Sequence, residues 1–464
     1  MIILGTNSIK DTGYNVANSV RYNDGDSPKL NIDFSSDGTL NKWTFSMWFK
    51  RSTLGTAQRL FCVIDSGMDD YIKFGTDDQL EWVFDNEDGS NKGVLKTNRK
   101  FRDVSAWYHL VCRLDTTDST AGDRMRMYIN GTEETSFATD TNPTLNETGD
   151  IGRDNNHYIG TSGSSQYFDG YIAEVCMINN QSLAPTSFGE YDEDSPTIWK
   201  PIDVSGLTAG TNGFYLDFED SGNLGNDAFG GTDWTETNLA ATDQSTDTCT
   251  NNFCTLNPLG GKRGNNTTFS EGNLKSVDTG STNGVDPNLH ATFGLTAGSW
   301  YFEMKAEAIT AGRMASIALL VQDGQGPDDY ADARTVNLYY EKNSSGNKIR
   351  KFSSDVETGL ADNAADDIFG VALDIDNGTV QFYKNGSTYG SQVTGLSSSG
   401  KTTFISMLGE GGSGRAATCN LNFGSPAFAI SSGNADGNGY GNFEYAVPSG
   451  FLALCTKNLG SDGG

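Results

Sequence analysis

The chain has 464 residues and a formal net charge of −28, from 60 acidic and 32 basic residues. So acidic a chain repels phosphate, and we expect no nucleic-acid partner. Glycine is abundant (56) and proline scarce (10), which is typical of short strands joined by turns. No apolar stretch reaches the length needed to cross a bilayer, so we expect no membrane insertion.

The N-terminal stretch MIILGTNSIKD lacks the basic start and the long apolar run of a signal peptide, so we expect none. The seven cysteines have no regular spacing, which predicts free and mostly buried thiols from a reducing compartment. They are Cys62, Cys112, Cys176, Cys249, Cys254, Cys419 and Cys455.

The first region, residues 1–225, is predicted to be a double-sheet sandwich. In WTFSMWFKR the residues Trp43, Phe45, Met47 and Phe49 fall on one face, and the other face is apolar near Trp48, which predicts a central strand. Further on, RMRMYINGTEE places Asn130-Gly131 between apolar and polar runs, a strong signal for a tight hairpin turn.

The order of phrases in this region resembles a laminin-G-like, concanavalin-like jelly roll. The phrases are W-T-x-S-x-W, W-Y-H-L-V, M-Y-I-N-G and Y-F-D-G-Y-I-A-E-V. Together with FRDVSAWYHLV, SLAPTSFGEYD and NGFYLDF, they resemble structural proteins of tailed bacteriophages, particularly those of marine bacteria. The resemblance covers residues 14–220.

Residues 226–266 are rich in Asn, Thr and Asp, with too few apolar residues for a core of their own, and we predict a linker ordered by packing on its neighbours. The second region, 267–464, contains the meander Asp366 to Gly390. Its reversals, at Asn377-Gly378 and Asn385-Gly386, are both expected to be type I′ turns with positive φ.

The second region resembles a SPRY-type β sandwich. The resemblance is carried by G-S-W-Y-F-E, D-I-F-G-V-A-L-D-I-D-N-G-T-V-Q-F-Y-K-N-G, N-F-G and P-S-G-F. The chain departs from that pattern in an insert from Asp323 to Val356. The fold expected for the whole chain is therefore all-β, with two antiparallel sandwiches of the jelly-roll kind joined by an irregular linker.

No pattern in the chain predicts a catalytic or cofactor-binding residue. Glycosidases on concanavalin-like sandwiches place two carboxylates on one strand, whereas Glu190 and Asp192 fall in a loop-like run beside Pro196. His109 sits within a strand pattern and is expected to be structural and half-exposed. The laminin-G resemblance implies one metal candidate, a Ca²⁺ site on the rim, for which Asp65, Asp69 and Asp70 are the candidate ligands.

The leading hypothesis is a non-enzymatic virion protein of a tailed phage, assembled in the host cytoplasm as a fibre, decoration or tail-associated component. Its expected partners are other virion proteins, a host-surface glycan or protein, and further copies of itself in a homo-oligomer. Two alternatives remain open: a secreted bacterial lectin or adhesin, and a polysaccharide hydrolase.

Overall fold

The computed structural model describes residues 13–462 apart from 65–68, 87–91, 194, 261–266, 279–287, 310–313, 323–334, 342–346, 352–353, 397–401 and 410–416. The chain is all-β, as predicted, and its sheets are antiparallel apart from one short parallel pairing. The described part contains one α-helix, α1 (Thr456–Asp462), and four short 3-10 turns, at Asp24–Asp26, Ala121–Asp123, Pro185–Ser187 and Ala241–Asp243. No helix among these residues is long and apolar enough to cross a membrane.

The chain divides into two compact units between Thr250 and Asn251. The segment 226–266, which the sequence suggested as a linker, is shared between them. Trp234 is buried in the first core, whereas Cys254 and Leu256 are buried in the second. The described part of the segment therefore contributes side chains to both cores.

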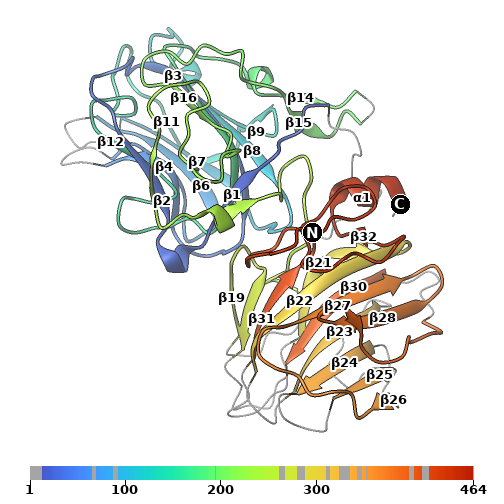
Figure 1. The fold of residues 1–464 in the computed structure, drawn as a ribbon. Coiled ribbons are helices and arrows are strands. Elements are labelled where there is room, and N and C mark those ends of the chain that lie inside the picture. The colour runs from blue at the N-terminus through green and yellow to red at the C-terminus, as the bar shows by residue number, and fades with distance from the viewer. Residues whose placement is uncertain are drawn as a thin grey trace. The chain divides into compact units, whose positions relative to one another are not determined.

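The first unit consists of two sheets that enclose one core (Figure 1). One sheet has the order β10-β9-β8-β3-β13-β1-β18, with β16 paired to β13, and the other has the order β11-β7-β6-β5-β4-β12-β2-β17; β14 and β15 form a separate hairpin. The strands are β1 (Ser19–Tyr22), β2 (Lys29–Asp33), β3 (Lys42–Arg51), β4 (Gln58–Val63), β5 (Tyr71–Phe74), β6 (Gln79–Phe84), β7 (Gly93–Lys100), β8 (Tyr108–Asp115), β9 (Met125–Ile129), β10 (Thr132–Glu133), β11 (Phe137–Thr141), β12 (Asn156–Ile159), β13 (Gly170–Asn179), β14 (Gly189–Tyr191), β15 (Trp199–Pro201), β16 (Phe214–Leu216), β17 (Thr235–Thr237) and β18 (Gln244–Ser245).

Strand β3 organises this unit. It lies between β8 and β13, as its two apolar faces predicted. Trp43, Phe45, Met47 and Phe49 point into the core, while Trp48 packs in a second cluster on the opposite face. Burial on both faces stabilises the strand through the hydrophobic effect, about 25 cal/mol for each Å² of apolar surface removed from water.

The second unit also has two sheets, drawn from yellow to red in Figure 1. Their orders are β19-β20-β31-β22-β27-β28-β29, with β32 paired to β22, and β21-β30-β23-β24-β25-β26. The strands are β19 (Thr267–Ser270), β20 (Lys275–Asp278), β21 (Asn288–Leu295), β22 (Ser299–Ile309), β23 (Met314–Gln322), β24 (Thr335–Glu341), β25 (Lys348–Lys351), β26 (Ser354–Thr358), β27 (Asp367–Asp374), β28 (Thr379–Lys384), β29 (Ser387–Thr388), β30 (Thr402–Gly409), β31 (Ala417–Asn422) and β32 (Leu452–Ala453).

The predicted meander is β27, β28 and β29, but only one of its two turns has the expected conformation. At the second reversal φ is 48° for Asn385 and 77° for Gly386, as a type I′ turn requires. At the first reversal only Gly378 has a positive φ, of 63°. The type I′ prediction was wrong there because the Asp374 carboxylate accepts hydrogen bonds from both the backbone and the side chain of Asn377. A four-residue loop replaces the two-residue turn.

The described part of the insert from Asp323 to Val356 forms strands. β24 and β25 lie wholly within it, β26 begins within it, and each pairs with its neighbour outward from β23. The insert therefore widens one sheet of the second sandwich.

Candidate binding surface on the first sandwich

The loop after β4 carries the candidate calcium ligands, of which Asp65 lies outside the described residues. The carboxylate of Asp69 forms an ion pair with Arg59, with 2.6 Å between Oδ1 and Nη1. Asp70 is fully buried, and its Oδ2 accepts hydrogen bonds from the backbone N–H groups of Asp150 (2.8 Å) and Ile151 (3.0 Å). The two neighbouring aspartates thus have different partners.

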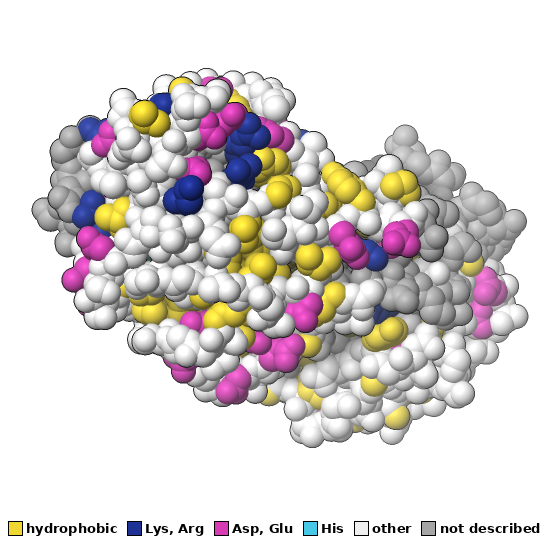
Figure 2. All heavy atoms as spheres, turned by 90° about the horizontal axis from the view of Figure 1, so that it is seen from above, with side chains coloured by type: hydrophobic (Ala, Val, Ile, Leu, Met, Phe, Trp, Pro, Cys, Tyr) yellow, Lys and Arg dark blue, Asp and Glu magenta, His cyan; other side chains and the backbone are white. Residues whose placement is uncertain are grey.

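The carboxylate of Asp70 links separate loops, because it also accepts a hydrogen bond from the backbone N–H of Asp85. Burial raises the pKa of Asp70 to about 8, although these three N–H donors favour its ionised form. Among the described residues no group of three or more His, Cys, Asp or Glu side chains could hold a metal ion. The calcium site stays a prediction that depends on Asp65. Figure 2 shows a face on which acidic side chains lie at several separate places.

His109 is buried rather than half-exposed, so that prediction was wrong. Its Nδ1 lies 2.9 Å from the indole Nε1 of Trp199, and its Nε2 lies 2.8 Å from Oγ of Ser46. An indole N–H can only donate, so Nδ1 accepts and Nε2 carries the proton that is donated to Ser46. His109 therefore cannot take a proton from Ser46 as a general base does, and burial lowers its pKa to about 3.

Glu190 lies within β14 rather than in a loop, whereas Asp192 lies in the loop between β14 and β15, as expected. Lys200 of β15 lies between the two carboxylates, 3.5 Å from Glu190 and 3.3 Å from Asp192. Both acids are thus paired with one ammonium group. The two carboxylates thus share a lysine, whereas a glycosidase places its two carboxyl groups on either side of the bond to be cleaved.

Glu174 is a buried acid of the kind often found at functional sites, and the sequence analysis did not single it out. It lies in β13, where the register shifts between Ala173 and Cys176, and its φ is 51°, in the left-handed region. Its buried carboxyl accepts a hydrogen bond from the Tyr215 hydroxyl at 2.7 Å, and burial raises its pKa to about 8. The signal was the single acid within the apolar run YIAEVCMI.

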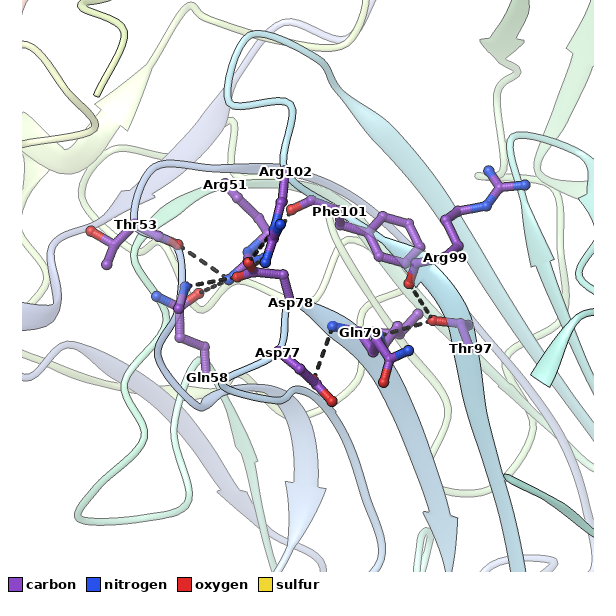
Figure 3. A network of polar contacts seen from close by, with 12 residues as sticks. Arg51, Thr53, Gln58, Asp77, Asp78, Gln79, Thr97, Arg99, Phe101 and Arg102 are labelled. Carbon is purple, nitrogen blue, oxygen red and sulfur yellow. Dashed lines mark hydrogen bonds and ion pairs between the residues drawn. The ribbon is translucent and has the colours of Figure 1, made fainter. Parts of the chain in front are cut away.

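A buried ion pair fastens together three loops at one end of the sandwich (Figure 3). Arg51 ends β3 and is fully buried, and its Nη1 lies 3.2 Å from Oδ1 of Asp78, which precedes β6. The same carboxylate accepts the N–H of Gly55 from the β3–β4 loop at 2.7 Å. It also pairs with Nε of Arg102, which follows β7, at 2.7 Å.

The pair has further support on both sides. Arg51 donates to the carbonyl oxygen of Phe101 at 2.8 Å, and its guanidinium lies 4.2 Å from the centre of the Phe74 ring. Burial opposes ionisation of Asp78, yet the Gly55 N–H and the two arginines hold its pKa below the usual value. These contacts make a rigid rim out of loops that are far apart in the sequence.

The solvent-facing side of the second sheet carries a row of charged and aromatic groups. Ile72 and Phe74 point into the core, so Tyr71 and Lys73 point outward. Arg59 and Lys73 both lie over the Tyr71 ring, at 4.0 and 4.3 Å from its centre. The Tyr71 hydroxyl donates to Glu81 at 2.6 Å. The row joins β4, β5 and β6, and it contains the arginine that holds Asp69.

Comparison with known proteins identifies the first sandwich. Residues 24–185, about a third of the chain, match the model of the concanavalin A-like lectin/glucanases superfamily. The first sandwich is thus similar to concanavalin A-like domains over these residues. No curated protein matches the chain.

Several solved structures are similar to parts of the chain. A putative carbohydrate binding protein from Bacteroides ovatus is 13% identical, with 48% of this chain and 59% of that chain covered and a TM-score of 0.32. The SPRY domain of human HERC1 is 12% identical, with 32% and 87% covered and a TM-score of 0.27. A heptameric pentraxin from Limulus polyphemus is 14% identical, with 37% and 80% covered and a TM-score of 0.28.

Proposed function

We propose that this chain is a non-enzymatic binding protein whose first sandwich presents a surface for a glycan or a protein. The observation that carries the proposal is a lectin-type domain in which the buried Arg51–Asp78 pair locks three rim loops together. A preorganised rim lowers the entropy cost of binding, because its loops are already ordered before the ligand arrives.

The state of the acids and of His109 supports binding over hydrolysis. Asp70 is engaged by three backbone N–H groups, and Glu190 and Asp192 share Lys200. The proton on Nε2 of His109 faces Ser46. Each of these arrangements uses the group to hold structure together, whereas a hydrolase needs a base or a raised carboxyl pKa free to act on substrate.

A glycan-binding assay with the full chain tests this proposal. We expect the protein to bind a subset of polysaccharides immobilised on an array and to release no reducing ends from them. Sustained release that disappears in the Glu190→Ala, Asp192→Ala double variant would overturn the non-enzymatic proposal in favour of a hydrolase. Binding to no glycan and to no protein of a host surface would remove the binding role itself.

We further propose that the protein is a structural component of a tailed-phage virion and acts in host attachment. The support is the order of phrases in residues 14–220, and the absence of heptads or short repeats, which predicts a compact component rather than a long shaft. We expect it to form a homo-oligomer anchored through its first sandwich, with the second facing outward.

Purified particles provide the test of the virion role. Mass spectrometry should detect the chain in stoichiometric amount, and antibodies against the second sandwich should label intact particles. A chain that is absent from the particles, or a second sandwich that antibodies cannot reach, would contradict this assignment.

A further inference from the structure

The most exposed positive charges of the described structure lie together at one place. Of all the lysines and arginines described, only Arg99, Lys100 and Arg102 are exposed, and the others are buried or half-buried. The three lie within four residues of sequence at the end of β7. In a chain of net charge −28 this grouping is the opposite of what the composition leads one to expect. We call residues 97–102 the basic arch.

The basic arch is held rigidly. Between β6 and β7 the register shifts, so that residues 97–99 form a bulge in β7. The hydroxyl of Thr97 donates to the carbonyl oxygen of Arg99 at 2.8 Å and accepts the N–H of Leu80 at 3.1 Å. Bulges of this kind re-aim the side chains that follow them. Figure 3 shows the Arg99 side chain extending away from the network around Asp78.

The far end of the arch is fixed by the rim network. Phe101 is buried in the core, and its N–H donates to the carbonyl oxygen of Asp78 at 2.9 Å. Arg102 is anchored to Asp78 through Nε, yet 54% of its side chain remains exposed. A surface cation whose backbone is fixed at both ends loses little conformational freedom when it binds a ligand.

The three exposed cations of the arch differ in their ion pairs. Arg99 has an ion pair with Glu134, at 2.9 Å, and is 47% exposed. Lys100 has no carboxylate within ion-pair distance among the described residues. The neighbouring cations are paired as well: Arg51 and Arg102 with Asp78, and Lys96 with Asp77. The Lys100 ammonium provides the uncompensated charge.

We propose that the basic arch binds an anionic polysaccharide, whose carboxylate or sulfate groups pair with Lys100 and with the exposed sides of Arg99 and Arg102. This inference rests on the proposed binding function and names its ligand class. The planar guanidinium groups match carboxylate and sulfate oxygens, and the flexible ammonium of Lys100 supplies a point charge. The side-chain amide of Asn98, which is also exposed, donates to the Ser136 hydroxyl at 3.1 Å and leaves its oxygen to accept from a sugar hydroxyl.

A polysaccharide fits this arch better than a nucleic acid does. Duplex DNA carries a negative charge about every 1.7 Å of its axis and needs a long basic track, whereas charges on an acidic glycan are separated by whole sugar rings. No other lysine or arginine in the described part of the chain is as exposed as the three cations of the arch. The closely spaced phosphates of a nucleic acid would also be repelled by the carboxylates elsewhere on this acidic chain.

Binding of defined polyanions by the full chain tests the proposal. The probes are dextran sulfate, polygalacturonate, neutral dextran and single-stranded DNA, so that sulfate, carboxylate and phosphate are compared with an uncharged control. We expect the two acidic glycans to bind and neutral dextran to bind at least about tenfold more weakly, with affinity falling as salt rises from about 0.01 M to about 0.15 M.

The variants are Lys100→Glu, Lys100→Gln and Lys42→Glu. Lys100→Glu should weaken binding of the acidic glycans about tenfold and Lys100→Gln by less, since charge reversal adds repulsion to the lost attraction. Lys42→Glu changes the net charge equally but lies at the opposite end of β3 from Arg51, about 30 Å away for ten strand residues, and should leave binding within about twofold.

Three outcomes would overturn the proposal: no binding of either acidic glycan, an equal loss in Lys42→Glu and Lys100→Glu, or preferential binding of DNA. Binding of neutral glycans or of a protein together with any of these would leave the proposed binding function standing. Near-UV circular dichroism of each variant shows whether it keeps the fold of the parent chain, since Lys100 is exposed but Lys42 is half-buried and pairs with Asp115 at 2.8 Å.

Discussion

Replacing Asp78 of the Arg51–Asp78 pair should destabilise the first sandwich by about 3–5 kcal/mol, and replacing Arg51 should destabilise it by less. Removing one member of a buried ion pair leaves the other charged and without compensation in a low-dielectric environment. In Arg51→Met, Asp78 keeps Gly55 and Arg102, whereas in Asp78→Asn the buried guanidinium loses its carboxylate. Asparagine tolerates the φ of 63° at position 78, so backbone strain does not add to the effect.

The melting temperature of the first unit reports the change. All tryptophans except Trp300 lie in residues 13–250, so tryptophan fluorescence follows this unit within the full chain. We expect a decrease of roughly 10 °C in Asp78→Asn and a smaller decrease in Arg51→Met. The double variant should be more stable than the sum of the single effects implies, because it leaves no unpaired charge.

Arg102→Ala is the matched control, since Arg102 binds the same carboxylate from the solvent side. An exposed ion pair contributes about 0–1 kcal/mol, so this variant should melt close to the parent chain. Equal destabilisation by Arg102→Ala and Arg51→Met would contradict the claim that the buried pair holds the rim.

The pair also has a predicted pH dependence. The pKa of Asp78 is lowered in the folded state, so its contribution is present in full above the unfolded value of about 3.9. The contribution is lost as the pH falls through the folded pKa, because protonation removes the charge that Arg51 faces. As the pH is lowered, the Asp78→Asn variant should therefore lose less stability than the parent chain does.

The periodic elements of this fold could be predicted from sequence, and contacts between distant loops could not. The alternation from Trp43 to Phe49 identified a strand because a period of two fits no helix, and the second apolar face near Trp48 placed that strand in the centre of its sheet. The φ values at Asn385 and Gly386 follow from local sequence as well. The same Asn-Gly dipeptide at Asn377 does not form a type I′ turn, because the Asn377 N–H binds the carboxylate of Asp374 within a longer loop.

The candidate surface depends on packing between elements. Arg51 and Asp78 are separated by 27 positions and meet only because β3 and the β5–β6 turn end on one side of the sandwich. The bulge that orients Arg99 is stabilised by the hydroxyl of Thr97. This hydroxyl donates to the carbonyl oxygen of Arg99 on its own strand and accepts the N–H of Leu80 on the neighbouring strand. Trp234 in the expected linker was a usable signal, since a tryptophan is seldom left in water.

In the second sandwich, Glu303 is the residue whose loss should have the largest effect. It lies on the outer side of β22, between the core residues Phe302 and Met304, and is fully buried. Its carboxylate accepts the backbone N–H groups of Glu444 (3.0 Å) and Tyr445 (2.9 Å). It therefore fastens the C-terminal segment across the outer face of the sheet.

Side chains complete this anchor. The Tyr301 hydroxyl donates to the carboxylate at 3.2 Å, and the amide of Asn422 donates to it at 3.3 Å. The amide of Asn422 also donates to the carbonyl oxygen of Asn442, so one segment is held at two points. Phe443 packs between these points against Tyr301, with ring centres 5.2 Å apart.

Glu303→Ala should lower the stability of the second unit by about 3 kcal/mol, because it leaves several buried donors without an acceptor. Hydrogen exchange should become faster at the amides of Glu444 and Tyr445, which would lose their acceptor. Glu307→Ala is the control on the same strand: its carboxylate is 41% exposed and pairs with Lys275, so its loss should cost about 1 kcal/mol or less.

The pH dependence of this unit separates the role of the charge from that of the shape. Burial raises the pKa of Glu303, so the group stabilises the fold most below its unfolded pKa of about 4.3, and this contribution declines as the pH rises through the folded value. Glu303→Gln keeps the shape and one acceptor oxygen but cannot ionise, so the second unit should lose less stability than the parent between acid and neutral pH. The measurement is the calorimetric melting temperature of the second unit across that interval.

Identical pH profiles for the parent and Glu303→Gln, or unchanged exchange at Glu444 and Tyr445 in Glu303→Ala, would show that the C-terminal segment is held by the apolar contacts of Phe443 and not by the buried carboxylate.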